Sequence, residues 1–240
     1  MYKKLEGIVV SEFTYEESSK IIKIFTKEGI VSIIAKGAKK LKSPFFSSTS
    51  KLTYGIYNII YKENGLSRLV DADILDDFRN IKKDIVKLSY ATFITELSME
   101  VYKHEDNKNI YELYLASINK INKGFDPLGI SDILSLKLLD NLGIRPVIDK
   151  CVSCGSTKDI VTVSSYLGGF VCKKCLKNEP LVDTRTISFI RGLYYIDIAK
   201  ISKLDIPDKV KKEIDIFIND YYERYSGIYL KSKSMLESIK

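Results

Sequence analysis

The chain has 240 residues, 45% hydrophobic and 29% charged, which predicts one large or two ordinary folded domains and excludes a disordered protein. It has no apolar run of about eighteen residues and no small-residue cleavage site near its start, so we expect no membrane span, no signal peptide and a cytoplasmic location. The net charge of +7 permits a nucleic-acid partner without requiring one.

The first eighty residues favour β structure. Stretches rich in Ile, Val, Phe and Tyr predict five strands, at 5–13, 20–26, 30–36, 51–62 and 66–75. Lys27-Glu28-Gly29 and Asn64-Gly65 fit hairpin turns. A sheet this small must remove its open edges, which favours a closed five-stranded barrel of the oligonucleotide-binding (OB) type. An SH3-like barrel has a similar strand count and stays the rival. Residues 43–50, "SPFFSSTS", are expected to form a loop.

From about residue 80, apolar residues recur every three or four positions, as on a buried helix face. Ser131 or Asp132 is the expected cap of one helix, and Pro207 suits the first turn of another. The predicted helices lie at about 81–101, 110–122, 133–143, 186–200 and 208–225. The predicted fold class is α+β. Residues 1–79 form an OB-fold DNA-binding barrel, and residues 80–240 form a helical domain with a zinc knuckle at about 149–178.

All four cysteines lie in one segment, as Cys151, Cys154, Cys172 and Cys175. This C-x₂-C-x₁₇-C-x₂-C spacing is typical of zinc ribbons, and a reducing cytoplasm makes disulfides unexpected. A hairpin between the pairs would bring four thiolates around one tetrahedral ion. Such a closed shell leaves no position for substrate, so the predicted zinc is structural. Iron in a rubredoxin-like site is the rival metal, and a redox pair lacks its usual βαβ context.

A second dense motif follows the third predicted strand. Lys36, Lys39, Lys40 and Lys42 fall within seven residues that contain no acid. Such a loop can follow a phosphate backbone, and composition supports a solvated basic turn equally well. Four nearby aromatic residues could stack bases, although our interpretation favours a place in the core: Phe45, Phe46, Tyr54 and Tyr57.

Motifs for catalysis do not support an enzyme. His104 is the only histidine and is expected at the surface, and the chain has neither a phosphate-binding P-loop nor a serine-nucleophile elbow. Four aspartates could suggest a metal-dependent nuclease, but their position before a helix fits N-capping better: Asp71, Asp73, Asp76 and Asp77.

Four segments in this order resemble the RecO family of bacterial recombination mediators. They are "AKGAKKLKS" (35–43), "LGIRPVIDKCVSCG" (142–155), "GGFVCKKC" (168–175) and "YLKSKSML" (229–236). The Gly-x-x-Pro run that leads into the cysteines is the most specific of these. Pro44 departs from the pattern, since members often carry another basic residue there.

The resemblance implies a non-enzymatic DNA-repair protein with an OB barrel and a zinc-bearing helical domain. Members bind single- and double-stranded DNA, anneal complementary strands, act with the RecR ring protein, recognise single-stranded DNA-binding protein and help load RecA. A cytoplasmic, nucleoid-associated location follows. Transferred onto this chain, the four cysteines become metal ligands and the four lysines become DNA contacts. The alternative is a zinc-ribbon protein–protein adaptor that does not bind DNA.

Overall fold

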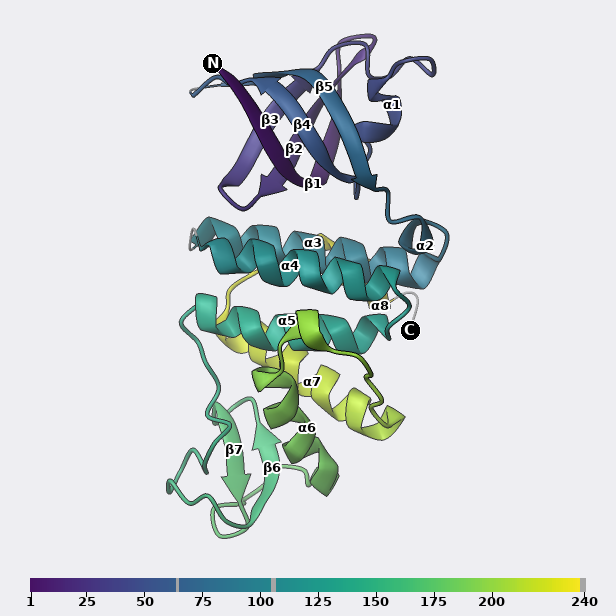
Figure 1. Cartoon of the computed structure of the whole chain (residues 1–240). Helices are drawn as coiled ribbons and strands as arrows, with labels where there is room; N and C mark the ends of the chain where they lie inside the picture. The colour runs from purple at the N-terminus through teal and green to yellow at the C-terminus, as the bar shows by residue number, and fades with distance from the viewer. Residues whose placement is uncertain (64, 105–106, 238–240) are drawn as a thin grey trace. The chain divides into compact units, whose positions relative to one another are not determined.

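The computed structural model describes residues 1–63, 65–104 and 107–237. The chain divides into two compact units, Met1–Lys83 and Asp84–Lys240 (Figure 1). Strands make up most of the first unit and helices most of the second. The assignment of DNA binding to residues 1–79 stays a prediction.

Five strands of the first unit close into a barrel in the order β1-β2-β3-β5-β4. β5 enters between β3 and β4, which is a Greek-key arrangement, and it runs parallel to β3. β1 is long enough to pair with β2 along its second half and with β4 along its first. The strands are β1 (Tyr2–Tyr15), β2 (Ser19–Thr26), β3 (Gly29–Ala35), β4 (Tyr54–Ile60) and β5 (Ser67–Asp76). The predicted fold class, an OB-type barrel followed by helices, is confirmed.

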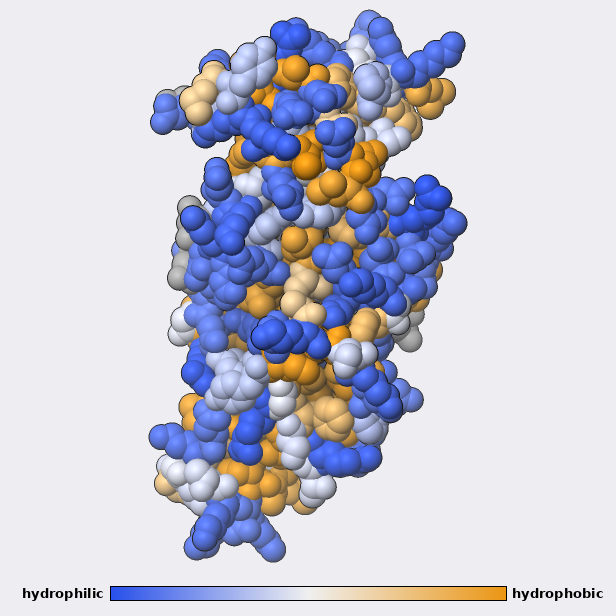
Figure 2. Space-filling view, in the orientation of Figure 1, coloured by the Kyte–Doolittle hydropathy of each residue, from blue (hydrophilic) through white to orange (hydrophobic). Residues whose placement is uncertain are grey.

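The barrel core follows from alternation along each strand, because successive side chains point to opposite faces. Ile22 and Ile24 on β2 and Ile33 on β3 are fully buried in it. Tyr57 is also fully buried, and its hydroxyl donates to the carbonyl of Ser48 at 2.9 Å. It is therefore a core residue, as the sequence favoured. Figure 2 shows that apolar side chains also reach the outer surface of this unit, among hydrophilic ones.

Some details of the first unit differ from the sequence prediction. The expected loop at 43–50 contains a short helix, α1 (Phe45–Ser48), whose C-cap residue Thr49 donates through Oγ1 to the carbonyl of Phe45 at 2.6 Å. A second short helix, α2 (Arg79–Lys82), follows β5. The Lys27–Gly29 turn is confirmed between β2 and β3, whereas Asn64 of the other predicted turn lies outside the described residues.

The second unit is a helical bundle in which α3 packs against α4 and α5, and α5 against α6 and α7. Thr95 Oγ1 on α3 and the Tyr114 hydroxyl on α4 lie 3.0 Å apart in its interior. Tyr222 on α7 donates to the carbonyl of Ser135 on α5 at 2.8 Å. The helices are α3 (Ile85–His104), α4 (Lys108–Asn122), α5 (Pro127–Asn141), α6 (Thr184–Tyr195), η1 (Ile198–Lys200), α7 (Asp208–Tyr225) and α8 (Lys231–Glu237).

Several helix boundaries were predicted wrongly. The helix expected from residue 81 is interrupted, because α2 ends at Lys82 and α3 begins at Ile85, and Pro207 is the N-cap of α7 and not part of its first turn. Asp126 caps α5 by accepting from the backbone N–H of Gly129, with Pro127 in the first turn, so Ser131 and Asp132 lie inside the helix. The segment expected as one helix at 186–200 stops at Tyr195, and a separate 3₁₀ turn follows it. None of the helices in the described residues combines the length and apolar character needed to cross a lipid bilayer.

Candidate nucleic-acid interface and metal centre

The lysine loop, residues 36–44, leaves β3 through a turn at Gly37, whose φ of +70° favours glycine. Ala38 is fully buried in the barrel core and anchors the loop. The backbone N–H of Lys39 donates to the carbonyl of Ser18 at 2.9 Å, which ties the loop to the β1–β2 turn. Two further turns follow, because Lys40 N–H donates to the Gly37 carbonyl and Ser43 N–H to that of Lys40. The loop backbone is thus held in place.

The side chains of the lysine loop are free. Lys36, Lys39, Lys40 and Lys42 are all exposed. Within the part of the chain that the structure describes, none of the four forms an ion pair with a carboxylate. A fixed backbone with four unpaired ammonium groups is an arrangement that suits a polyanion.

The metal knuckle, residues 149–178, begins with a tight turn at the first cysteine pair. The backbone N–H of Cys151 donates to the carbonyl of Ser156 at 2.7 Å, and Gly155 N–H donates to the carbonyl of Cys151 at 2.9 Å. Gly155 has a φ of +74°, a left-handed conformation that favours glycine directly after the pair. At the second pair, the N–H groups of Cys175 and Leu176 both lie 3.0 Å from the carbonyl of Cys172.

A short hairpin brings the two cysteine pairs together. β6 (Ile160–Ser164) pairs antiparallel with β7 (Gly169–Cys172), as the sequence predicted. Val147 lies against the start of β7, accepting from Phe170 N–H at 2.8 Å. A Cβ at Gly169 would lie 2.2 Å from the carbonyl oxygen of Val147, so only glycine allows this approach. The close contact gives the Gly-Gly pair a physical role.

The four sulfurs meet at one point. The Sγ atoms of Cys151, Cys154, Cys172 and Cys175 all lie within 4.8 Å of one another. Those of Cys154 and Cys172 are 3.6 Å apart, close to the tetrahedral edge of about 3.8 Å that Zn–S bonds of about 2.3 Å require. In the described part of the chain, this is the one convergent group of three or more potential ligands. The donor set therefore fits a tetrahedral thiophilic ion.

The surroundings of Cys151 and Cys175 shift the pKa values of these two thiols in opposite directions. Burial opposes ionisation of Cys151, but N–H groups of Cys172, Cys154 and Ser153 outweigh it and lower its pKa to about 6. Hydrogen bonding to the Cys154 thiol, with burial and the other sulfurs adding to it, raises the pKa of Cys175 to about 12. Because four thiolates this close would repel one another, the thiols do not all lose their protons on their own. A bound cation would offset that repulsion and displace the protons that remain.

Comparison with known proteins covers nearly the whole chain. The family model "Recombination protein O N terminal" matches residues 1–78, and "Recombination protein O C terminal" matches residues 82–234. DNA repair protein RecO of Halalkalibacterium halodurans is 33% identical over 245 residues, covering 100% of this chain and 96% of the relative. The RecO protein of Bacillus cytotoxicus is 34% identical over 246 residues, covering 100% and 98%. The chain belongs to the RecO family.

Other predicted positions of this RecO-family chain do not converge into a site. His104 is exposed, as expected. Asp76 accepts from the N–H of Phe78 at 2.7 Å, and Asp77 pairs with Arg79 at 3.6 Å, which supports a local structural role rather than a metal cluster. Neither aspartate is the formal cap of α2, because that position is Phe78 in a left-handed conformation.

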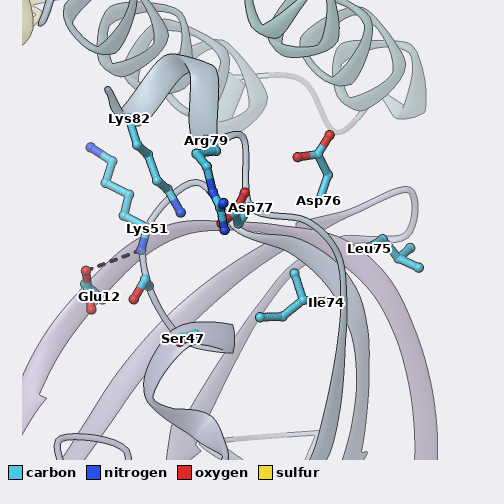
Figure 3. Close-up of a pocket in the computed structure, with 10 residues that line it drawn as sticks. Glu12, Ser47, Lys51, Ile74, Leu75, Asp76, Asp77, Arg79 and Lys82 are labelled. Carbon is cyan, nitrogen blue, oxygen red and sulfur yellow. Dashed lines mark hydrogen bonds and ion pairs between the residues drawn. The ribbon is translucent and has the colours of Figure 1, made fainter. Parts of the chain in front are cut away.

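A hollow of about 690 Å³ lies at the α1 and α2 end of the barrel unit (Figure 3). Lys82 reaches into it and donates to Thr53 Oγ1 at 3.3 Å, and burial lowers its pKa. Equal numbers of cationic and anionic side chains line the hollow: Lys51, Arg79, Lys82, Glu12, Asp76 and Asp77. Because these charges offset one another, the hollow does not favour an anion as the lysine loop does.

The sequence did not single out Phe13, although more than half of its surface is exposed. The aromatic residues considered instead have mixed positions. Tyr57 lies in the barrel core, and Phe45 is partly buried against that core. Phe46 is exposed, with Lys20 Nζ 5.5 Å from its ring centroid. Only strand register could have identified Phe13, because register aligns it, through Ile21, with Ile34 and Arg68 of later segments.

Proposed function

We propose that this RecO-family chain is a non-enzymatic recombination mediator that binds single- and double-stranded DNA and anneals complementary strands. The observation that carries the proposal is the lysine loop, with four exposed and unpaired ammonium groups on a backbone tied to an OB-type barrel. DNA repair is the role named for the RecO relatives. Neutralising phosphates lowers the repulsion between strands, so annealing needs no bond to be made and no nucleotide cofactor.

Binding of a labelled single-stranded oligonucleotide across a salt series tests the proposal. Each phosphate contact contributes roughly 0.7 to the slope of log K against log salt. Removing two contacts with Lys39→Glu/Lys40→Glu should flatten the slope by about 1.4 and weaken binding about 25-fold at 0.1 M salt. Fluorescence anisotropy measures both quantities. An unchanged slope in this variant would contradict a role for the lysine loop.

The runner-up function is a zinc-ribbon adaptor that binds only protein. It predicts that the metal-loaded wild type binds neither the oligonucleotide nor a duplex. Annealing of two complementary labelled strands without ATP is the second readout. A requirement for ATP would contradict the mediator mechanism, and absence of all DNA binding would favour the adaptor.

We extend the proposal to the partners that the family resemblance implies, namely RecR, single-stranded DNA-binding protein and RecA. The expected reaction is loading of RecA onto single strands coated with single-stranded DNA-binding protein, in the presence of RecR. RecA filament formation on coated DNA, measured with each component left out in turn, tests it. Filaments that form equally fast without this chain would refute the role.

We also propose that the knuckle holds a structural Zn²⁺ ligated by Cys151, Cys154, Cys172 and Cys175. The convergence of four sulfurs supports this, and a closed shell has no place for a substrate. Metal analysis of the purified protein should give one zinc per chain. One iron per chain would instead support the rubredoxin-like alternative.

A further inference from the structure

The outward face of the barrel carries a line of side chains that binding through the lysine loop does not use. Phe13 on β1 pairs with Ile21 on β2. Ile21 pairs with Ile34 on β3, which pairs in turn with Arg68 on β5. Directly paired positions point to the same face of a sheet, so these four residues form one line across four strands. We call it the transverse row.

The transverse row faces away from the core. Ile22 and Ile33, each one position away in sequence, are fully buried, so Ile21 and Ile34 point outward. Phe13 keeps 56% of its surface exposed, and both isoleucines are partly exposed. Apolar side chains aligned at a surface are typical of a binding site, whereas scattered ones need no explanation.

Basic groups border the transverse row. Lys23 and Lys36 lie two residues beyond Ile21 and Ile34 on the same outward side, and both are exposed. The lysine loop continues from Lys36 and is tied to the β1–β2 turn, which joins the two strands that carry Phe13 and Ile21. Three apolar side chains in line with Arg68, beside unpaired cations, complement a chain with a charged backbone and flat, apolar bases.

We propose that the transverse row is a base-stacking surface for single-stranded nucleic acid, with Phe13 as the stacking side chain and the lysine loop holding the adjacent phosphates. This inference rests on the proposed function and assigns it a second, chemically different contact. A duplex keeps its bases stacked on each other, so its bases are not available to Phe13. The lysines then bind either form of DNA, and the row favours single strands.

The chain has no tryptophan, so Phe13→Trp places a single indole in the transverse row. Titration with an oligothymidylate of about twelve nucleotides should quench the fluorescence of this indole. The Kd from the quenching curve should equal the Kd from fluorescence anisotropy. Tyr2→Trp is the matched control. Tyr2 lies on the same strand with 74% of its surface exposed, but its place at the other end of β1 puts it roughly 30 Å away. Its indole should keep its fluorescence.

Phe13→Ala should weaken single-strand binding about 5- to 140-fold, because one stacked base loses its platform. It should leave duplex affinity and the salt slope unchanged, since no phosphate contact is removed. Phe13→Leu keeps an apolar side chain without a ring and should bind as weakly as Phe13→Ala. Circular dichroism checks that each variant folds. We expect folding to be retained, because Phe13 is exposed.

The result that overturns the proposal is wild-type affinity in Phe13→Ala. If Lys39→Glu/Lys40→Glu has lost binding in the same assay, the proposed function stands and only the stacking surface fails. If the wild type binds no oligonucleotide, both fail. An equal loss of single-strand and duplex affinity in Phe13→Ala also overturns it, because stacking on an unpaired base cannot produce that result.

Discussion

The lysine loop and the metal knuckle each concentrate four residues of one type, and the fold directs them in opposite ways. In the lysine loop the backbone is fixed by hydrogen bonds and by Ala38, while the four side chains end in solvent. In the knuckle the backbone turns bring four side chains to one point. Four like residues close together in sequence can therefore form either a surface for an external partner or an internal ion site. Only the backbone conformation decides between the two.

The lysine loop and the metal knuckle also differ in their local charge. The lysine loop has no acidic residue, so its positive charge is available to a partner. The knuckle also carries exposed lysines, namely Lys150, Lys158, Lys173, Lys174 and Lys177. Two acidic residues, Asp149 and Asp159, lie among them, and Glu179 follows the knuckle directly. Four thiolates around a divalent ion would add two further negative charges. These charges offset the lysines, so the proposed DNA contacts belong to the loop.

Removal of the proposed zinc should have the largest effect, and this effect should be confined to the second unit. Stripping the metal with a chelator, or changing the buried Cys151 to Ser, is expected to cost several kcal/mol of apparent stability, because a structural zinc site contributes its binding free energy to folding. Thermal unfolding with and without chelator measures this. Acidification should act in the same direction, since protons compete with the metal for the thiolates.

The control for metal removal is DNA binding by the barrel. Single-strand affinity at low salt should survive in the chelated protein if the lysine loop and the knuckle act independently. A loss of binding as large as that of Lys39→Glu/Lys40→Glu would break the comparison and make the knuckle part of the interface.

A smaller effect is expected from Gly37→Ala, which tests whether the loop backbone matters. Nothing lies within 4 Å of the added Cβ, so the cost comes from the φ of +70° and should be about 1 kcal/mol in urea unfolding. Gly192→Ala is the matched control, because this glycine lies inside α6 with equal space and no positive φ. That change should stabilise by up to about 1 kcal/mol. Equal signs in the two variants would refute the backbone argument.

The smallest effect is expected from Lys173→Glu/Lys174→Glu, which repeats the double charge reversal on the knuckle. Because local charges already offset these lysines, single-strand affinity should fall by less than about threefold and the salt slope should change little. The measurement is the anisotropy series used for the lysine loop, with metal content checked in both variants. A loss comparable to that of the loop variant would place a second phosphate contact on the knuckle.

Local patterns were enough to predict the five strands and the cluster of four sulfurs. Alternation and turn residues predicted the five strands, and the Cys-x-x-Cys spacing predicted the sulfur cluster, because each depends on residues near one another in sequence. The short helix α1 was missed, since "SPFFSSTS" has weak helix propensity and the turn is stabilised by side-chain contacts such as that of Thr49. Asp126 was missed because Ser131 and Asp132 offered equally good caps.

Features that depend on register were not predictable. Phe13 and Arg68 lie far apart in sequence and share one line only because β2 and β3 connect them within the sheet. The contact between Val147 and Gly169 also joins segments on either side of the first cysteine pair. Strand propensity identifies strands, whereas cross-strand partners depend on the closed barrel as a whole.

Closure by β1 has a consequence for synthesis on the ribosome. The first half of this strand pairs with β4, and Tyr2 is paired with Ile60. The start of β1 therefore cannot pair until β4 has been synthesised. At about 5–20 residues per second, that wait lasts several seconds. Until then the nascent chain presents an open strand edge, the kind of surface that recruits neighbouring chains. The knuckle closes over a shorter stretch, from Cys151 to Cys172, so its wait is about a third as long.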